Sequence, residues 1–206
     1  MKLQLAVDRM PVSQTLQLLD QLTPYLDILE MGTSYTKEYG VAFLKALHSR
    51  YSKTKILADL KIMDEAAYEC ELYYGAGAQI VTVMGAAALS TIQITQACAK
   101  RWNRQYCIDL LEVKKMKLSA LSKFHDAIFC IHLPKDSEGN LITLIQEQKK
   151  LLPDGVQIAA AGGIGYEQLP ALHAAGVDIV IIGSAITGHK EPLRQIQKYR
   201  KWVNKA

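Results

Sequence analysis

The stretch ILADLKIMDEA (residues 56–66) decides the fold, because it combines the pattern of a buried strand with charged residues. Successive side chains of a strand point to opposite faces, so Asp59 and Lys61 share one face. Burying a charge costs free energy unless the charge is paired or used. The stretch therefore predicts a buried strand that carries either a structural ion pair or part of a functional site.

Segments of this buried-strand type recur along the chain, and stretches with helical spacing separate them. The helical stretches include residues 12–22, 41–51 and 193–203. Near-continuous apolar strands that alternate with helices are typical of a parallel sheet covered on both faces. The expected strands are residues 3–8, 26–32, 55–62, 80–85, 106–111, 127–133, 156–163 and 178–186.

Eight such strand–helix units predict a closed (β/α)8 TIM barrel, near the lower end of the size range of that fold. An open doubly wound sheet is the alternative, and the regular series of eight units disfavours it. The chain has 206 residues and no Pro/Gly/Ser-rich linker, so we expect one domain over residues 1–206.

The composition argues against several classes of protein. The net charge is only +4 and the basic residues are scattered, so no nucleic-acid partner is expected. The sequence has neither a signal-peptide pattern nor an uncharged run of about 18 residues, so no membrane segment is expected. Its 4 cysteines show no CxxC spacing, which predicts reduced core thiols and a cytoplasmic protein.

Polar residues gather at the expected carboxyl ends of the strands, where barrel enzymes have their active sites. A single strand-end aspartate is ordinarily a helix cap, and a single histidine is ordinarily a hydrogen-bonded core residue. Several carboxylates, a lysine and a histidine at one mouth instead suit metal binding and proton transfer. These residues are Asp8, Glu30, Asp59, Lys61, Asp109 and His132.

Two of these carboxylates are candidate metal ligands. Glu30 and Asp59 lie on adjacent expected strands, and two oxygen ligands with open positions suit Mg²⁺. No Cys- or His-rich ligand set is evident, so a zinc site is not expected. A second interpretation needs no metal, because Lys61 alone can neutralise both carboxylates. The residues leave these two interpretations open.

Glycines follow the last two expected strands, in AGGI (residues 161–164) and GSAI (residues 183–186). Glycine lets an anion approach the backbone, and the N–H groups at a helix start favour negative charge. Barrel enzymes often hold a phosphate group between these two loops. The pair of motifs predicts a phosphate-binding region.

Six blocks of the chain resemble those of the 3-hexulose-6-phosphate synthase family, in order and in spacing, from residue 3 to about residue 187. ADLKIMD carries the D-x-K-x-x-D signature of the orotidine 5'-monophosphate decarboxylase superfamily, in which 3-keto-L-gulonate-6-phosphate decarboxylase is a sister branch. The blocks are LQLAVD, DILEMGT, ADLKIMD, IVTVMGA, AAAGGI and VIIGSAIT.

The resemblance implies a Mg²⁺-dependent aldol reaction in which formaldehyde adds to D-ribulose 5-phosphate through an enediolate. It implies that Glu30 and Asp59 bind the metal and that Lys61 stabilises the enediolate charge. His132 would remove the C1 proton of the substrate, and Asp109 would orient His132 or assist it. The product would be D-arabino-hex-3-ulose 6-phosphate.

The resemblance also implies a homodimer with shared active sites. Asp8 would contact substrate hydroxyls, and Asp64 would reach the site of the neighbouring subunit. The residues that would hold the phosphate are Gly162, Gly163, Gly183 and Ser184.

Three motifs favour the synthase branch, and one loop departs from it. Decarboxylases usually have IEL, TGG and GRS where this chain has IDL, AGG and GSA. Synthases follow the histidine with H-x-G-x-D, whereas residues 132–140 read HLPKDSEGN, with Pro134 in place of the glycine. His132 and Asp136 remain. Lys135 occupies a position where the decarboxylases have an arginine, so this loop leaves the reaction open.

Three alternatives follow. The first is decarboxylation of 3-keto-L-gulonate 6-phosphate, with Lys135 in the role of the arginine. The second is a Schiff-base aldolase that uses Lys61 as the nucleophile. The third is a protein that binds a sugar phosphate with weakened catalysis. Orotidine monophosphate decarboxylation is disfavoured, because DLKIMDEAAYE lacks the D-x-K-x-x-D-I-x-x-T extension.

Overall fold

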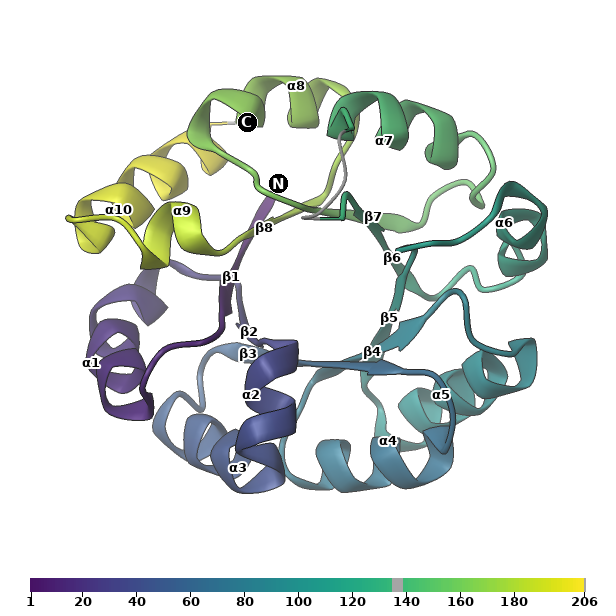
Figure 1. Ribbon diagram of the computed structural model, residues 1–206, viewed down its shortest axis with the longest axis horizontal. Coiled ribbons are helices and arrows are strands. Elements are labelled where there is room, and N and C mark those ends of the chain that lie inside the picture. The colour runs from purple at the N-terminus through teal and green to yellow at the C-terminus, as the bar shows by residue number, and fades with distance from the viewer. Residues whose placement is uncertain (135–138, 206) are drawn as a thin grey trace.

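Eight parallel strands pair in chain order and close into a barrel, and helices surround it (Figure 1). This computed structural model describes residues 1–134 and 139–205. The strands are β1 (Lys2–Val7), β2 (Ile28–Met31), β3 (Lys55–Ile62), β4 (Ile80–Met84), β5 (Gln105–Asp109), β6 (Ile128–His132), β7 (Gln157–Ala161) and β8 (Ile179–Ile182). The predicted (β/α)8 barrel is confirmed.

The helices connect successive strands on the outside of the barrel. Two short 3-10 helices, η1 (Thr23–Tyr25) and η2 (Tyr166–Gln168), supplement them. The α-helices are α1 (Val12–Leu22), α2 (Thr33–Glu38), α3 (Gly40–Arg50), α4 (Ala66–Gly75), α5 (Leu89–Trp102), α6 (Lys115–Leu121), α7 (Leu141–Lys149), α8 (Leu169–Ala174), α9 (Ser184–Thr187) and α10 (Pro192–Val203). None of those in the described ranges is long and apolar enough to cross a bilayer.

The alternation of side chains along the strands builds two separate apolar layers. In β1, Leu3, Leu5 and Val7 point outward and pack in the large layer between the sheet and the helices. A second, smaller layer fills the barrel interior and includes Ile28, Leu57, Ile80, Cys107 and Ile179. This inner layer forms the floor on which the polar residues of the upper strand ends rest.

Most strand limits lie within about two residues of the expected ones. The structure departs further from the expectation at two places. The eighth strand was expected to run through residue 186, but β8 ends at Ile182 and residues 184–187 form α9. A short helix, α2, also follows β2 directly, where no helix was expected. In both cases the sequence passes from the strand into a short helix without a clear change in its pattern of apolar residues. The spacing of apolar residues does not identify a helix as short as α2 or α9.

Candidate active site

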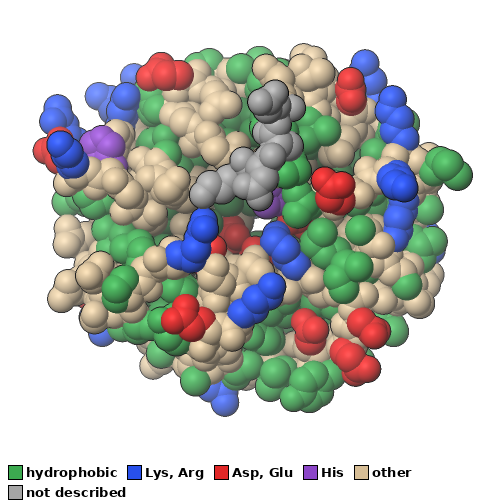
Figure 2. All heavy atoms as spheres, in the orientation of Figure 1, with side chains coloured by type: hydrophobic (Ala, Val, Ile, Leu, Met, Phe, Trp, Pro, Cys, Tyr) green, Lys and Arg blue, Asp and Glu red, His purple; other side chains and the backbone are tan. Residues whose placement is uncertain are grey.

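A cavity of about 530 Å³ opens at the carboxyl ends of the strands. Figure 2 shows that face, with a hollow at its centre, acidic side chains inside the hollow and basic side chains on its rim. The predicted site residues that line the cavity are Asp8, Glu30, Asp59, Lys61, Asp109, His132, Gly162, Gly163, Gly183 and Ser184. The barrel therefore gathers onto one surface side chains that lie far apart in the sequence.

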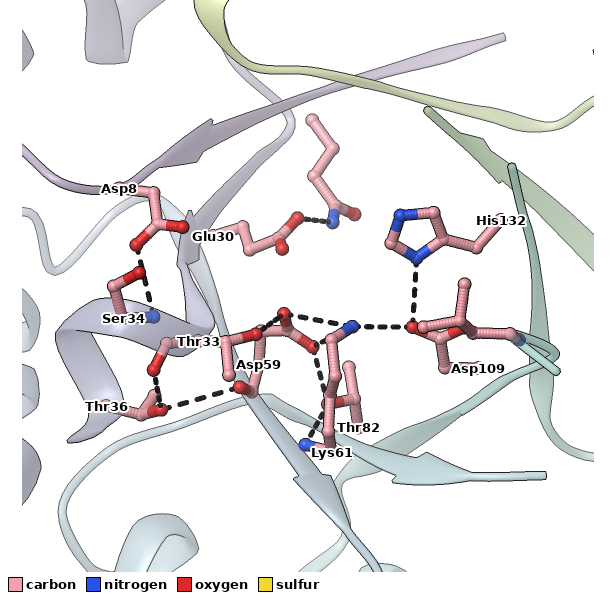
Figure 3. A network of polar contacts seen from close by, with 12 residues as sticks. Asp8, Glu30, Thr33, Ser34, Thr36, Asp59, Lys61, Thr82, Asp109 and His132 are labelled. Carbon is pink, nitrogen blue, oxygen red and sulfur yellow. Dashed lines mark hydrogen bonds and ion pairs between the residues drawn. The ribbon is translucent and has the colours of Figure 1, made fainter. Parts of the chain in front are cut away.

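Lys61 is the centre of the charge network (Figure 3). Its Nζ lies 2.6 Å from Oδ2 of Asp109 and 3.2 Å from Oδ2 of Asp59. Burial alone would lower the pKa of Lys61, but the charges of the two aspartates outweigh it and raise this pKa well above its ordinary value. Lys61 is therefore a permanent ammonium ion that bridges β3 and β5.

A backbone irregularity in β3 helps to place this ammonium group. The pairing between β3 and β4 shifts register between Ala58 and Ile62, and Lys61 adopts a left-handed φ of 51°. Its backbone N–H donates to Oγ1 of Thr82 over 2.8 Å. The same hydroxyl donates to Oδ1 of Asp59 over 2.8 Å. A single threonine thus fixes both the irregular backbone and the neighbouring carboxylate.

Asp109 links Lys61 to His132. Burial tends to raise the pKa of Asp109, but the hydrogen bond from His132 and the charge of Lys61 outweigh burial and lower this pKa to about 2. Nδ1 of His132 lies 3.2 Å from Oδ2 of Asp109. Because an ionised carboxylate only accepts hydrogen bonds, Nδ1 carries the imidazole proton. The other ring nitrogen points into the cavity, and no contact to it is drawn among the residues shown in Figure 3.

Glu30 lines the same cavity, but its surroundings raise its pKa, whereas those of Asp109 lower the pKa of that residue. Burial and then the nearby charge of Asp59 raise the pKa of Glu30 to about 8. Nε2 of Gln4 donates to Oε2 of Glu30 over 2.5 Å, and this hydrogen bond, together with the smaller effect of the Lys61 charge, offsets only part of the rise in pKa. Two buried carboxyl groups whose ionised forms repel one another favour a bound cation, and their oxygens are the ligands that Mg²⁺ prefers. Glu30 and Asp59 therefore suit the predicted metal.

The loops predicted to bind phosphate lie across the cavity from this network, beyond β7 and β8. Gly162 has a φ of 114°, and a Cβ atom there would lie 2.4 Å from the carbonyl oxygen of Leu133. Only glycine fits this close approach. Gly163 has a φ of 61°, and a Cβ atom there would meet nothing within 4 Å, while Gly183 precedes the first residue of α9. The two loops leave backbone exposed to the cavity.

Asp8 and Asp64 occupy different surroundings. Asp8 lies one residue beyond β1, and its Oδ1 accepts a hydrogen bond of 3.1 Å from the N–H of Ser34 near the start of α2. Asp64 is exposed, accepts from the N–H of Glu65 and does not line the cavity of its own chain. Its expected role in a neighbouring subunit stays a prediction. Lys135 and Asp136 lie outside the described residues.

The structure adds polar residues that the sequence alone did not single out. Thr33 donates from Oγ1 to Oδ2 of Asp59, while Gln4 and Thr82 complete the contacts given above. These are uncharged residues on strands or helix starts, and their role becomes visible only once the strands are paired. Oriented hydroxyl and amide donors of this kind hold carboxylates in place.

Sulfur ligands also reach the cavity. The donor atoms of Asp109, Cys130 and His132 all lie within 4.8 Å of one another. Hydrogen bonding with the Cys107 thiol and burial raise the pKa of Cys130 well above its ordinary value, so Cys130 is a neutral thiol. The pairing of β5 with β6 places Asp109 beside Cys130, which no sequence spacing indicates.

Comparison with known proteins places the chain in a family. The chain is 33% identical over 193 residues to "3-hexulose-6-phosphate synthase" of Methylomonas aminofaciens, covering 92% of each chain. It is 30% identical over 209 residues to the protein of the same name from Bacillus subtilis (strain 168), covering 98% of this chain and 99% of the relative.

A solved structure of 3-hexulose-6-phosphate synthase from Salmonella typhimurium superposes with a TM-score of 0.92 at 31% identity, covering 100% of this chain and 99% of the other. The family model described as "Orotidine 5'-phosphate decarboxylase / HUMPS family" matches residues 1–199. The chain belongs to this family.

Proposed function

We propose that the protein catalyses the aldol addition of formaldehyde to D-ribulose 5-phosphate, which makes it an aldehyde-lyase of the 3-hexulose-6-phosphate synthase type. The observation that carries this proposal is the chain of contacts Asp59–Lys61–Asp109–His132 at the floor of a cavity with two glycine loops. It combines a base, a fixed cation and a phosphate-binding region. The relatives at 30–33% identity carry the name of that reaction.

In this proposal the glycine loops after β7 and β8 bind the substrate phosphate. The free ring nitrogen of His132 removes the proton from C1 of D-ribulose 5-phosphate, and Asp109 holds the imidazole in the required tautomer. The charge moves onto the enediolate oxygens, next to the Lys61 ammonium group. C1 then forms a carbon–carbon bond to formaldehyde, and the aldehyde oxygen takes up a proton to become the new hydroxyl.

Glu30 and Asp59 are the proposed Mg²⁺ ligands. When bound, the metal would supply Lewis-acid stabilisation of negative charge on the substrate oxygens. The charge distribution of the chain supports this assignment, because burial and Asp59 together raise the pKa of Glu30 to about 8. Asp8, at the edge of the same cavity, is proposed to contact substrate hydroxyls.

The electrostatics of Lys61 disfavour a Schiff-base mechanism. A nucleophilic lysine needs a free amine, which proteins obtain by lowering the pKa of the lysine. Here two aspartates raise that pKa instead. A fixed ammonium group suits stabilisation of an enediolate better than covalent attack on a carbonyl.

We further propose that the protein forms a homodimer through α4 and α5, with Asp64 contributing to the partner's site. Exposed apolar residues on and beside these two helices support such an interface. Met63 is 54% exposed, Tyr68 66% and Ile94 42%. Sedimentation velocity of the wild type and of Tyr68→Glu tests this interface, because a dimer held by this surface should dissociate in the variant. An identical mass for both proteins would count against the assignment.

We also propose a cytoplasmic location, with which the 4 buried free cysteines are consistent.

The proton-transfer step can be tested without formaldehyde. When D-ribulose 5-phosphate is incubated with the protein and Mg²⁺ in deuterium oxide, one of its C1 hydrogens should exchange for deuterium. Nuclear magnetic resonance measures the rate of this exchange. His132→Gln should lose this exchange while it still binds the substrate. Exchange at the wild-type rate in His132→Gln would remove His132 from its proposed role.

A further inference from the structure

We infer that the cavity contains a second cation site, made by Asp109, Cys130 and His132, that takes a thiophilic divalent ion such as Zn²⁺. The ligand atoms of these three residues lie within 4.8 Å of one another. All three line the same cavity, which gives an ion a route from solvent. This inference concerns a different metal and different ligands from those of the proposed function.

The distances suit a small ion with sulfur and nitrogen ligands. Zinc binds sulfur at about 2.3 Å and nitrogen or oxygen at about 2.0 Å, so neighbouring tetrahedral ligands are about 3.3–3.6 Å apart. Nδ1 of His132 and Oδ2 of Asp109 are 3.2 Å apart. Because the three donor atoms lie within 4.8 Å of one another, they need to close by at most about 1.2–1.5 Å to reach this geometry. A water molecule from the cavity can complete the coordination.

Strand pairing holds these donors in place. Cys130 and His132 are alternate residues of β6 and therefore project from the same face. Asp109 pairs directly with Cys130 across the β5–β6 ladder. Asp109 and Cys130 are only 2% and 4% exposed, so both donors are held in the packed barrel rather than on a mobile surface. Buried mixed donors of this kind differ from a solvated acidic cluster.

The charge around the site also favours an added cation. Asp59 and Asp109 share one ammonium group, Lys61, and Glu30 lies in the same cavity. An ion on Asp109 competes with Lys61 for Oδ2, but Lys61 retains its contact of 3.2 Å with Asp59. The ammonium group can therefore remain paired when Asp109 turns to the metal.

Ligand chemistry separates the two metals. Glu30 and Asp59 offer only oxygen, which suits Mg²⁺, whereas the thiolate and imidazole at the second site suit Zn²⁺ or Co²⁺. Binding at the second site requires the Cys130 thiol to give up its proton to solvent, and it requires the imidazole proton of His132 to move from Nδ1 to the other ring nitrogen by exchange with solvent. Because the ion would occupy Asp109 and His132, it would also block the base of the proposed reaction.

Cobalt(II) titration of the reduced, metal-free protein under anaerobic conditions tests the inference. We expect a near-ultraviolet thiolate-to-cobalt charge-transfer band that saturates at one equivalent. Cys130→Ala should lose the band, whereas the matched control Cys70→Ala, a buried cysteine of α4 that does not line the cavity, should keep it. Zn²⁺ should displace Co²⁺, and excess Mg²⁺ should not.

Two outcomes would overturn the inference: no charge-transfer band in the wild type, or a band of equal strength in Cys130→Ala. If Cys130→Ala does not fold, Cys130→Ser repeats the test, because its hydroxyl keeps the size of the side chain but gives no thiolate band. Loss of the ligand should weaken binding by at least the roughly 10- to 100-fold that even a supporting residue contributes.

An activity assay adds an independent arm that rests on the proposed function. In the presence of Mg²⁺, a slight excess of Zn²⁺ should inhibit aldol addition by the wild type and spare Cys130→Ala. Inhibition of both proteins to the same extent would contradict the inference. If the protein has no aldol activity, the cobalt spectrum still decides whether the site exists, so failure of the proposed function is distinguishable from failure of the inference.

Discussion

Replacing Lys61 by methionine is the most informative perturbation of the charge network. The change keeps the length of the side chain and removes the ammonium group that contacts Asp59 and Asp109. Both aspartates are buried, at 6% and 2% exposure, so the variant leaves two carboxylates without their cation. Removing one partner of a buried ion pair costs about 3–5 kcal/mol.

Urea unfolding at pH 8 in the presence of EDTA measures this cost as a decrease in the free energy of unfolding. In thermal unfolding of a chain of 206 residues, a loss of about 3–5 kcal/mol lowers Tm by between about 6 and 20 °C. Lys53→Met is the matched control, because Lys53 is exposed, and we expect it to change stability by less than about 0.5 kcal/mol.

The pH dependence gives a second check on the same variant. Without Lys61, the pKa of folded Asp109 rises, because burial is then opposed only by the hydrogen bond and the charge of His132. Protonation of Asp109 therefore costs the folded variant less than it costs the wild type, so the stability gap between the two proteins should be smaller at acid pH than at pH 8. A cost below about 1 kcal/mol at pH 8 would refute the interpretation of Lys61 as the cation that neutralises this site.

Three further predictions follow from the site. Asp109→Asn should cost about 2.6 kcal/mol at pH 7, because the pKa of Asp109 is about 2 when folded and about 3.9 when unfolded. This cost should disappear as the pH falls from about 5 towards 2, and a cost independent of pH would contradict the assignment. Gly162→Ala should destabilise the protein more than Gly163→Ala, because a Cβ at Gly162 meets a backbone oxygen and a Cβ at Gly163 meets nothing within 4 Å. Gly163→Ala should cost only about 1–2 kcal/mol. Equal costs of the two substitutions in urea unfolding would argue against the close approach of the loops. Asp59→Asn should abolish turnover with Mg²⁺ present while the protein stays folded by circular dichroism, and retention of most activity would remove Asp59 from the metal site.

Much of the fold was predictable from the sequence because its physical cause is local. Near-continuous apolar runs such as IVTVM (residues 80–84) can only be buried on both faces, and eight of them in series leave few arrangements besides a closed barrel. Asp109 and His132 were expected at strand ends, and they are the last residues of β5 and β6. The predicted end of the eighth strand was wrong, because GSAI (residues 183–186) has the apolar character of a strand but lies at the start of α9.

The contacts within the site were less predictable, because they depend on register between strands. The alternation rule predicted that Asp59 and Lys61 share a face, but it gave no sign of the irregular pairing and the left-handed φ at Lys61. The grouping of Cys130 with Asp109 likewise depends on which residues of β5 and β6 lie opposite one another. Spacing along one chain does not contain that information.

Consumption of formaldehyde in the presence of D-ribulose 5-phosphate, with Mg²⁺ and then with EDTA, tests the central claim most directly. The proposed function predicts that formaldehyde disappears only when both the sugar phosphate and Mg²⁺ are present, and that D-arabino-hex-3-ulose 6-phosphate appears in equal amount. A parallel assay offers 3-keto-L-gulonate 6-phosphate as substrate. Release of carbon dioxide from that compound, with no consumption of formaldehyde, would contradict the account.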